Sequence, residues 1–227
     1  MTLLALILPV AFLFSAFVSA EPERTSKETV YLLHGMGRTR VSMWWLGRRL
    51  KWEGYRVVNF PYNQASETLP EISGRLRTRI AKEAPARYHF VTHSLGGVIV
   101  RDGFREGYPE GLERIVMLAP PNHPPLLAKG LKGNPLYKLW TGDSGAKMAD
   151  ISFYANLPIP TVSFGVVAGT RGNGLLSKEK NDGVILMKTA RLKGMSDFKE
   201  VPHSHTFLMN SKDTAKLVFR FLRRGEF

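Results

Sequence analysis

Short apolar runs alternate with amphipathic helical patterns along most of the chain. Runs rich in β-branched, leucine and aromatic residues predict buried strands at 30–33, 55–60, 115–118 and 161–168, and a further strand that ends at Thr92. Between these runs, apolar residues recur at helical spacing in 42–54, 69–84 and 209–222. Strands that alternate with helices predict an α/β fold: a mostly parallel, doubly wound sheet with helices on both faces.

The first twenty residues differ in character from the rest. Thr2 to Ala20 carry no charged residue, and the sequence turns abruptly polar at Glu21. Small residues at the end of this run fit a signal-peptidase site, although the lack of Lys and Arg before it is less typical of a signal peptide. We expect residues 1–20 to be a cleaved export signal, which predicts a periplasmic or secreted protein; the alternative is a retained membrane anchor. Residues 21–227 have the length of one domain with a single core.

The stretch 90–100, Phe-Val-Thr-His-Ser-Leu-Gly-Gly-Val-Ile-Val, predicts a strand, a sharp turn and a helix with Ser94 at the apex. A serine in such a turn is held in a strained conformation that exposes its hydroxyl to a cleft. The usual pattern is G-x-S-x-G. Here Thr92 stands in place of the first glycine, and Gly96 supplies the second. Ser94 is therefore a candidate nucleophile; the alternative is an ordinary strand-to-helix turn that contains a serine.

A serine nucleophile needs a base, and the base needs a carboxylate that orients it. Asp182 follows a glycine-rich loop after the strand expected at 161–168, and His205 lies shortly before the final helix. The order serine, acid, histidine is the one that accompanies this kind of turn. Weaker candidates for the acid are Asp143, Asp150 and Asp197, and His203 competes with His205 for the role of base.

Together these features resemble the α/β-hydrolases, most closely small bacterial lipases and esterases with little or no cap. The resemblance covers roughly residues 28–222 and rests on His34-Gly35, on the stretch around Ser94, on 181–184 and on 205–208. It implies a catalytic triad of Ser94, Asp182 and His205. His205 is preferred to His203 because it directly precedes a Thr–hydrophobic pair that leads into the last helix.

The resemblance also implies an oxyanion hole formed by the backbone N–H groups of Met36 and Leu95. His93, beside the nucleophile, is expected to have a structural role, and His123 to line the cleft. Residues 122–150 are rich in Pro, Gly and Lys and include leucines and aromatics from Leu126 to Trp140. This segment could form a flap over an acyl chain or could simply pack on the sheet.

Composition narrows the chemistry further. The chain has no cysteine, which excludes disulfides, cysteine nucleophiles and thiolate metal sites. No set of His, Asp and Glu has metal-ligand spacing, so we expect neither a metal nor another cofactor. The net charge of +13 favours anionic partners, but the 32 basic residues are dispersed, and no nucleic-acid partner is expected. We expect a monomer that associates weakly, and in a salt-sensitive manner, with anionic membranes.

The sequence therefore predicts a serine hydrolase that cleaves a carboxylic ester of a small molecule or a lipid through an acyl-enzyme. An acyltransferase, a thioesterase or an amidase would use the same residues. A non-catalytic module that binds lipid or protein is the alternative of a different class.

Overall fold

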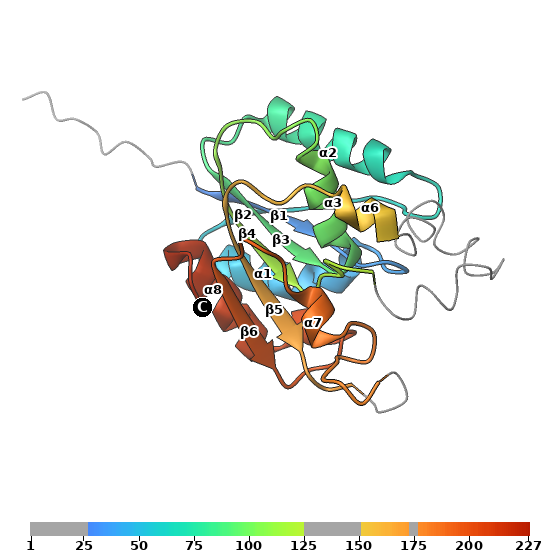
Figure 1. Ribbon diagram of the computed structural model, residues 1–227. Coiled ribbons are helices and arrows are strands. Elements are labelled where there is room, and N and C mark those ends of the chain that lie inside the picture. The colour runs from blue at the N-terminus through green and yellow to red at the C-terminus, as the bar shows by residue number, and fades with distance from the viewer. Residues whose placement is uncertain (1–26, 125–150, 173–176) are drawn as a thin grey trace, which may run out of the picture.

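The computed structural model describes residues 27–124, 151–172 and 177–227 (Figure 1). The segment 1–20 and most of the expected flap 122–150 lie outside the described residues. No helix within the described ranges is both long and apolar enough to cross a bilayer.

The described residues form a six-stranded sheet in the order β2-β1-β3-β4-β5-β6, with every pair of neighbours parallel. This arrangement confirms the expected α/β class with a parallel sheet. The strands are β1 Thr29–Leu33, β2 Arg56–Asn59, β3 Tyr88–His93, β4 Leu112–Leu118, β5 Ser163–Gly169 and β6 Asp197–Val201.

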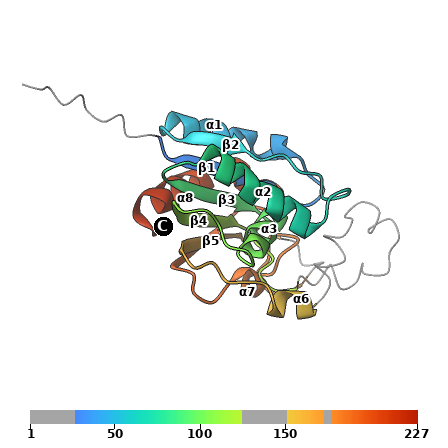
Figure 2. The same ribbon diagram turned by 90° about the horizontal axis from the view of Figure 1, so that it is seen from above.

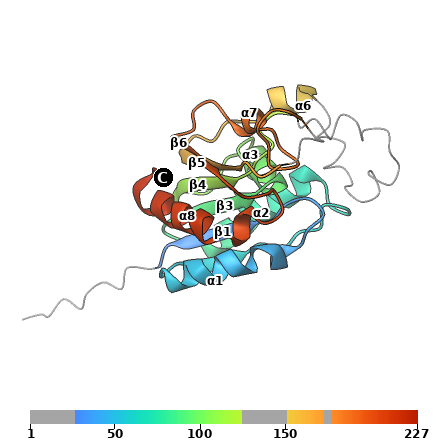
Figure 3. The same ribbon diagram turned by 90° about the horizontal axis from the view of Figure 1, so that it is seen from below.

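Helices cover both faces of this sheet. They are η1 Arg40–Met43, α1 Trp44–Trp52, α2 Leu69–Glu83, α3 Leu95–Gly103, α6 Ile151–Ala155, α7 Met187–Ala190, η2 Leu208–Asn210 and α8 Lys212–Arg224. Figure 2 shows α2 and α3 on one side of the strands, and Figure 3, from the opposite side, shows α1 and α8. Each face has its own cluster of buried apolar side chains.

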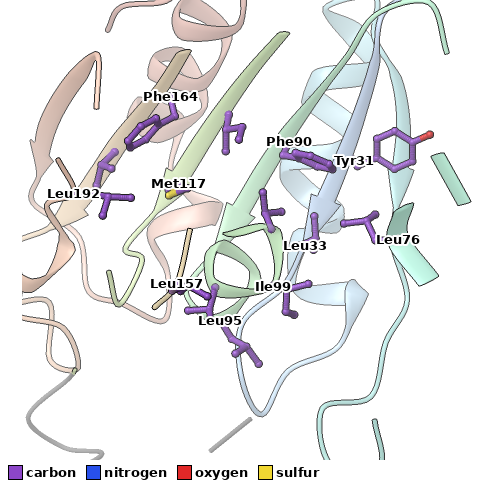
Figure 4. Close-up of a cluster of buried hydrophobic side chains, with 14 of the residues drawn as sticks. Tyr31, Leu33, Leu76, Phe90, Leu95, Ile99, Met117, Leu157, Phe164 and Leu192 are labelled. Carbon is purple, nitrogen blue, oxygen red and sulfur yellow. The ribbon is translucent and has the colours of Figure 1, made fainter. Parts of the chain in front are cut away.

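The cluster beneath α2 and α3 explains why these helices form where they do. Leu69, Ile72, Leu76 and Ile80 recur on one side of α2 and are fully buried. A capping box at Thr68 satisfies the first turn of this helix. On α3, Leu95 and Ile99 pack in the same cluster beside the side chains of β1, β3 and β4 (Figure 4).

Two elements differ from the sequence expectation. The edge strand β6 has the sequence Asp-Phe-Lys-Glu-Val, which is too polar to be recognised as a buried strand. The final helix begins at Lys212 rather than at Met209, because the side chain of Ser211 caps it by accepting the N–H of Thr214 at 2.9 Å. Residues 208–210 form the separate turn η2.

Candidate active site

Ser94 occupies a sharp turn between β3 and α3. Its backbone has φ 51° and ψ −117°, a conformation that L-amino acids adopt only when the surrounding structure enforces it. Strand β4 stabilises this conformation, because the Ser94 N–H donates to the carbonyl of Leu118 at 2.9 Å. This bond extends the strand pairing into the turn. In the part of the chain that the structure describes, the Ser94 hydroxyl has no hydrogen-bond partner.

Two glycines allow the turn to pack this tightly against the end of β1. A Cβ on Gly96 would lie 2.7 Å from the carbonyl oxygen of Leu33, which is backbone and cannot swing away. A Cβ on Gly35 would lie 2.7 Å from the ring of His93 and 3.2 Å from the Cβ of Ser94. The loop after β1 therefore lies directly against the serine turn.

Thr92, which stands where the usual pattern has glycine, is an ordinary strand residue. It pairs with Leu33 on one side and with Met117 on the other, and its φ is not positive. A side chain at this position therefore causes no backbone strain.

Asp182 and His205 form a buried hydrogen-bonded pair. Nδ1 of His205 donates to Oδ2 of Asp182 at 2.7 Å, and the backbone N–H of His205 donates to the Asp182 carbonyl at 2.9 Å. The other carboxylate oxygen accepts the N–H groups of Val184 at 3.0 Å and Ile185 at 2.7 Å. Both oxygens therefore accept hydrogen bonds, which fixes the carboxylate. Because the proton of the neutral ring lies on Nδ1, Nε2 of His205 is unprotonated.

The competing residues lie in other surroundings. Asp197 is at the amino end of β6, where its oxygens accept the N–H groups of Phe198 and Phe227, each at 2.7 Å. His203 lies 3.7 Å from the exposed Asp213 and is not paired with Asp182. The other two acid candidates, Asp143 and Asp150, lie outside the described residues.

His93 connects the serine turn to the histidine loop. Its ring is buried, and Nε2 donates to the backbone carbonyl of His205 at 3.0 Å. The two imidazole rings have their centroids 4.8 Å apart. Burial, together with the nearby His205, holds the pKa of His93 well below its usual value, so the ring stays neutral. His93 directly precedes Ser94 and thus holds the backbone of His205 beside the serine turn. Among the described residues, no hydrogen bond joins Ser94 to His205.

Tyr62 holds the loop after β1, a role that no local sequence pattern indicates. The Tyr62 hydroxyl donates to the carbonyl of His34, and the two rings stack with centroids 3.9 Å apart. His34 is buried, and burial lowers its pKa. Neither Met36 nor Leu95 donates its backbone N–H to a described residue, so within the described ranges both expected oxyanion donors are without a partner.

Arg101, seven residues after Ser94 on α3, hydrogen-bonds to the segments that precede and follow residues 125–150. Its guanidinium is buried and donates to the carbonyls of Leu157, Pro158 and Asn122. Burial lowers its pKa to about 10. The Asn122 side chain in turn donates to the carbonyl of Ala190 at 2.8 Å. Nothing in the local pattern around Arg101 marks it as buried, since arginine on a helix is usually exposed.

Two smaller observations complete the site. His123 is exposed, and its backbone N–H donates to the carbonyl of Thr189 at 3.1 Å. Across the described ranges, no three His, Asp or Glu side chains gather in a way that could hold a metal ion.

Comparison with solved structures defines the class of fold. The mature lipase BlEst2 of Bacillus licheniformis matches with a TM-score of 0.58 and 17% identity, over 92% of this chain and 95% of that one. The metagenomic carboxyl esterase MGS0156 matches with a TM-score of 0.66 and 18% identity, over 81% and 66%. A structure from work on the metagenome-derived lipolytic enzymes LipS and LipT matches with a TM-score of 0.66 and 15% identity, over 88% and 95%.

These likenesses show that the chain has an α/β-hydrolase fold like that of lipases and esterases, as its sequence motifs implied. No protein-family model and no curated protein matches the sequence.

Proposed function

We propose that this protein is a serine hydrolase that cleaves carboxylic esters. One observation carries the proposal: the buried Asp182–His205 pair is tied through His93 to the strained turn at Ser94. A carboxylate that holds Nδ1–H leaves Nε2 of His205 able to accept a proton, which is the state a general base requires. The fold shared with esterases and lipases supports the same reaction class.

In the proposed reaction, Nε2 of His205 takes the hydroxyl proton of Ser94 as the oxygen attacks the ester carbon. The backbone N–H groups of Met36 and Leu95 stabilise the oxyanion of the tetrahedral intermediate. The intermediate collapses as His205 returns the proton to the leaving alcohol, and an acyl-enzyme remains. His205 then takes a proton from water as the water oxygen attacks the acyl carbon, and it returns that proton to the oxygen of Ser94 as the acid leaves.

The setting of this reaction is also a proposal. We infer that residues 1–20 direct export or anchor the protein at a membrane, and that residues 21–227 act as a monomer without a metal or another cofactor. Substrates would be small-molecule or lipid esters.

The test combines covalent labelling with kinetics. A fluorophosphonate probe should label the folded protein at Ser94, located by peptide mass mapping, and Ser94→Ala should abolish labelling. The same variant should lose on the order of 10⁴-fold or more in kcat on p-nitrophenyl esters while it remains folded. Ser196→Ala is the matched control, because Ser196 is exposed and lies at the opposite end of the sheet, directly before β6.

Full labelling and activity in Ser94→Ala would refute the proposal. Labelling at Ser94 without hydrolysis of any ester from short to long acyl chain would indicate another acyl acceptor or leaving group for the same nucleophile.

A further inference from the structure

Large hydrophobic side chains are exposed along one side of η1 and α1. Val41 is 73% exposed, Trp44 56% and Trp52 71%. The spacing places these side chains on one side of the helix together with Arg48, four residues from each tryptophan. The Arg48 guanidinium lies over both indoles, 5.2 and 5.3 Å from the ring centroids. The cation therefore holds two tryptophans in an ordered, outward-facing row.

The charge along this row is predominantly positive. Residues 38–52 contain five basic residues and no acidic one. Arg40, Arg48 and Lys51 are exposed, and none of them belongs to an ion pair with another described residue. Helix α8 lies beside α1 and exposes further basic side chains at Lys212, Lys216, Arg220, Arg223 and Arg224. Arg223 and Arg220 pair with Glu53 and Glu226, whereas Arg40, Arg48 and Lys51 have no such pair among the described residues and are left for a partner to neutralise.

We propose that this surface, the α1 face (Val41, Trp44, Arg48, Lys51 and Trp52), docks on an anionic phospholipid bilayer. Indole rings favour the headgroup level of a membrane, where the ring meets acyl chains and the N–H meets water. Lys and Arg at the same level are attracted by anionic headgroups. A second copy of the chain does not fit, because two such faces would bring like charges together.

The α1 face begins at the rim of the candidate active site. Turn η1 contacts η2, and η2 follows His205 by three residues. Phe207, between them in sequence, is 64% exposed. A bilayer bound to the α1 face would therefore lie close to this rim. The docking itself does not depend on the proposed function, since binding is measured without catalysis.

Vesicle co-sedimentation of the full chain tests the proposal. Vesicles of phosphatidylcholine alone are compared with equimolar phosphatidylcholine and phosphatidylglycerol, at a lipid concentration that binds half of the wild-type protein. Lys51→Glu is paired with Lys82→Glu, the same charge reversal on an exposed lysine near the end of α2, on the other face of the sheet. Trp44→Ser/Trp52→Ser is paired with Ile159→Ser, which changes an exposed apolar side chain outside the α1 face.

We expect the wild type to bind anionic vesicles more strongly than neutral ones. Lys51→Glu should weaken binding to the anionic vesicles about fivefold or more, and the tryptophan pair at least about tenfold, while both controls bind as the wild type. Because every variant keeps residues 1–20, the differences report on the α1 face alone. Thermal unfolding verifies that each variant is folded.

Three results would overturn the inference. One is a loss in Lys51→Glu that is no larger on anionic than on neutral vesicles, and another is equal loss in each variant and its control. The third is binding that depends on Lys51 but not on the tryptophans, which would indicate an acidic polymer or protein as the partner. Hydrolysis of a soluble short-chain ester should be unchanged in all four variants, so failure of docking and failure of the proposed function give different results.

Discussion

The substitution Asp182→Asn offers a stringent test of the candidate site, because the hydrogen bonds around residue 182 determine which orientation the asparagine amide can take. Oδ1 of Asp182 accepts two backbone N–H groups, and Oδ2 accepts Nδ1–H of His205. If the amide oxygen keeps the two backbone bonds, the NH₂ group faces Nδ1 of His205. That nitrogen must then be unprotonated, so the proton moves to Nε2, and the ring can no longer accept a proton from Ser94.

The opposite amide orientation is also costly. It would aim NH₂ at the N–H groups of Val184 and Ile185 and leave two buried donors without an acceptor, at about 1–3 kcal/mol each. The first orientation should therefore prevail, with the protein folded and the base in the wrong tautomer. By analogy with triads in general, we expect kcat/KM to fall about 10⁴-fold, equivalent to roughly 5.4 kcal/mol of transition-state stabilisation.

The assay is kcat/KM on a soluble p-nitrophenyl ester together with thermal unfolding, and Asp197→Asn is the matched control. Asp197 also accepts two backbone N–H groups but contacts no histidine. Its variant should lose about 1–3 kcal/mol of stability and keep its activity. Near wild-type activity in Asp182→Asn, with a crippled Asp197→Asn, would refute the assignment of the acid.

Two further predictions concern the histidines. His205→Ala should lose nearly as much kcat as removal of the nucleophile, whereas His203→Ala should lose little, because only His205 pairs with Asp182; the reverse result in ester assays would exchange their roles. The depressed pKa of His93 means that the unfolded chain takes up a proton near pH 6.5 that the folded chain does not. Stability should therefore fall as the pH is lowered through about 6.5, with at most about 1.4 kcal/mol per pH unit from this residue. His93→Gln should flatten the dependence of Tm on pH, and an unchanged slope would contradict a neutral buried His93.

The local pattern of the sequence was sufficient for the order of the elements and for the fold class. Period-two and period-3.6 repeats depend on neighbours within a few residues, so the helix α2 and the buried stretch before Ser94 could be recognised directly. The start of α8, which the Ser211 hydroxyl caps, and the polar edge strand β6 show the limit of such patterns. An edge strand is defined by its partner across the sheet, not by its own hydrophobicity.

The candidate site residues also came from the sequence, and the family resemblance favoured Asp182 with His205, but the residue pattern alone left the pairing open. Four aspartates and two histidines were candidates, and only the packing of the loops after β5 and β6 brings Asp182 to His205. Long-range contacts of this kind join residues that no short pattern relates. His93 reaches the His205 carbonyl across 112 residues of sequence.

The same reason explains the residues whose roles only the tertiary structure decided. Arg101 is buried because the carbonyls of residues 157 and 158 and of Asn122 converge on it and replace water as its hydrogen-bond partners. Trp44 and Trp52, which helical periodicity alone would assign to a core, are exposed because the opposite side of α1 packs on the sheet. A sequence specifies which side chains share a face of a helix, but the neighbouring elements decide which face meets water.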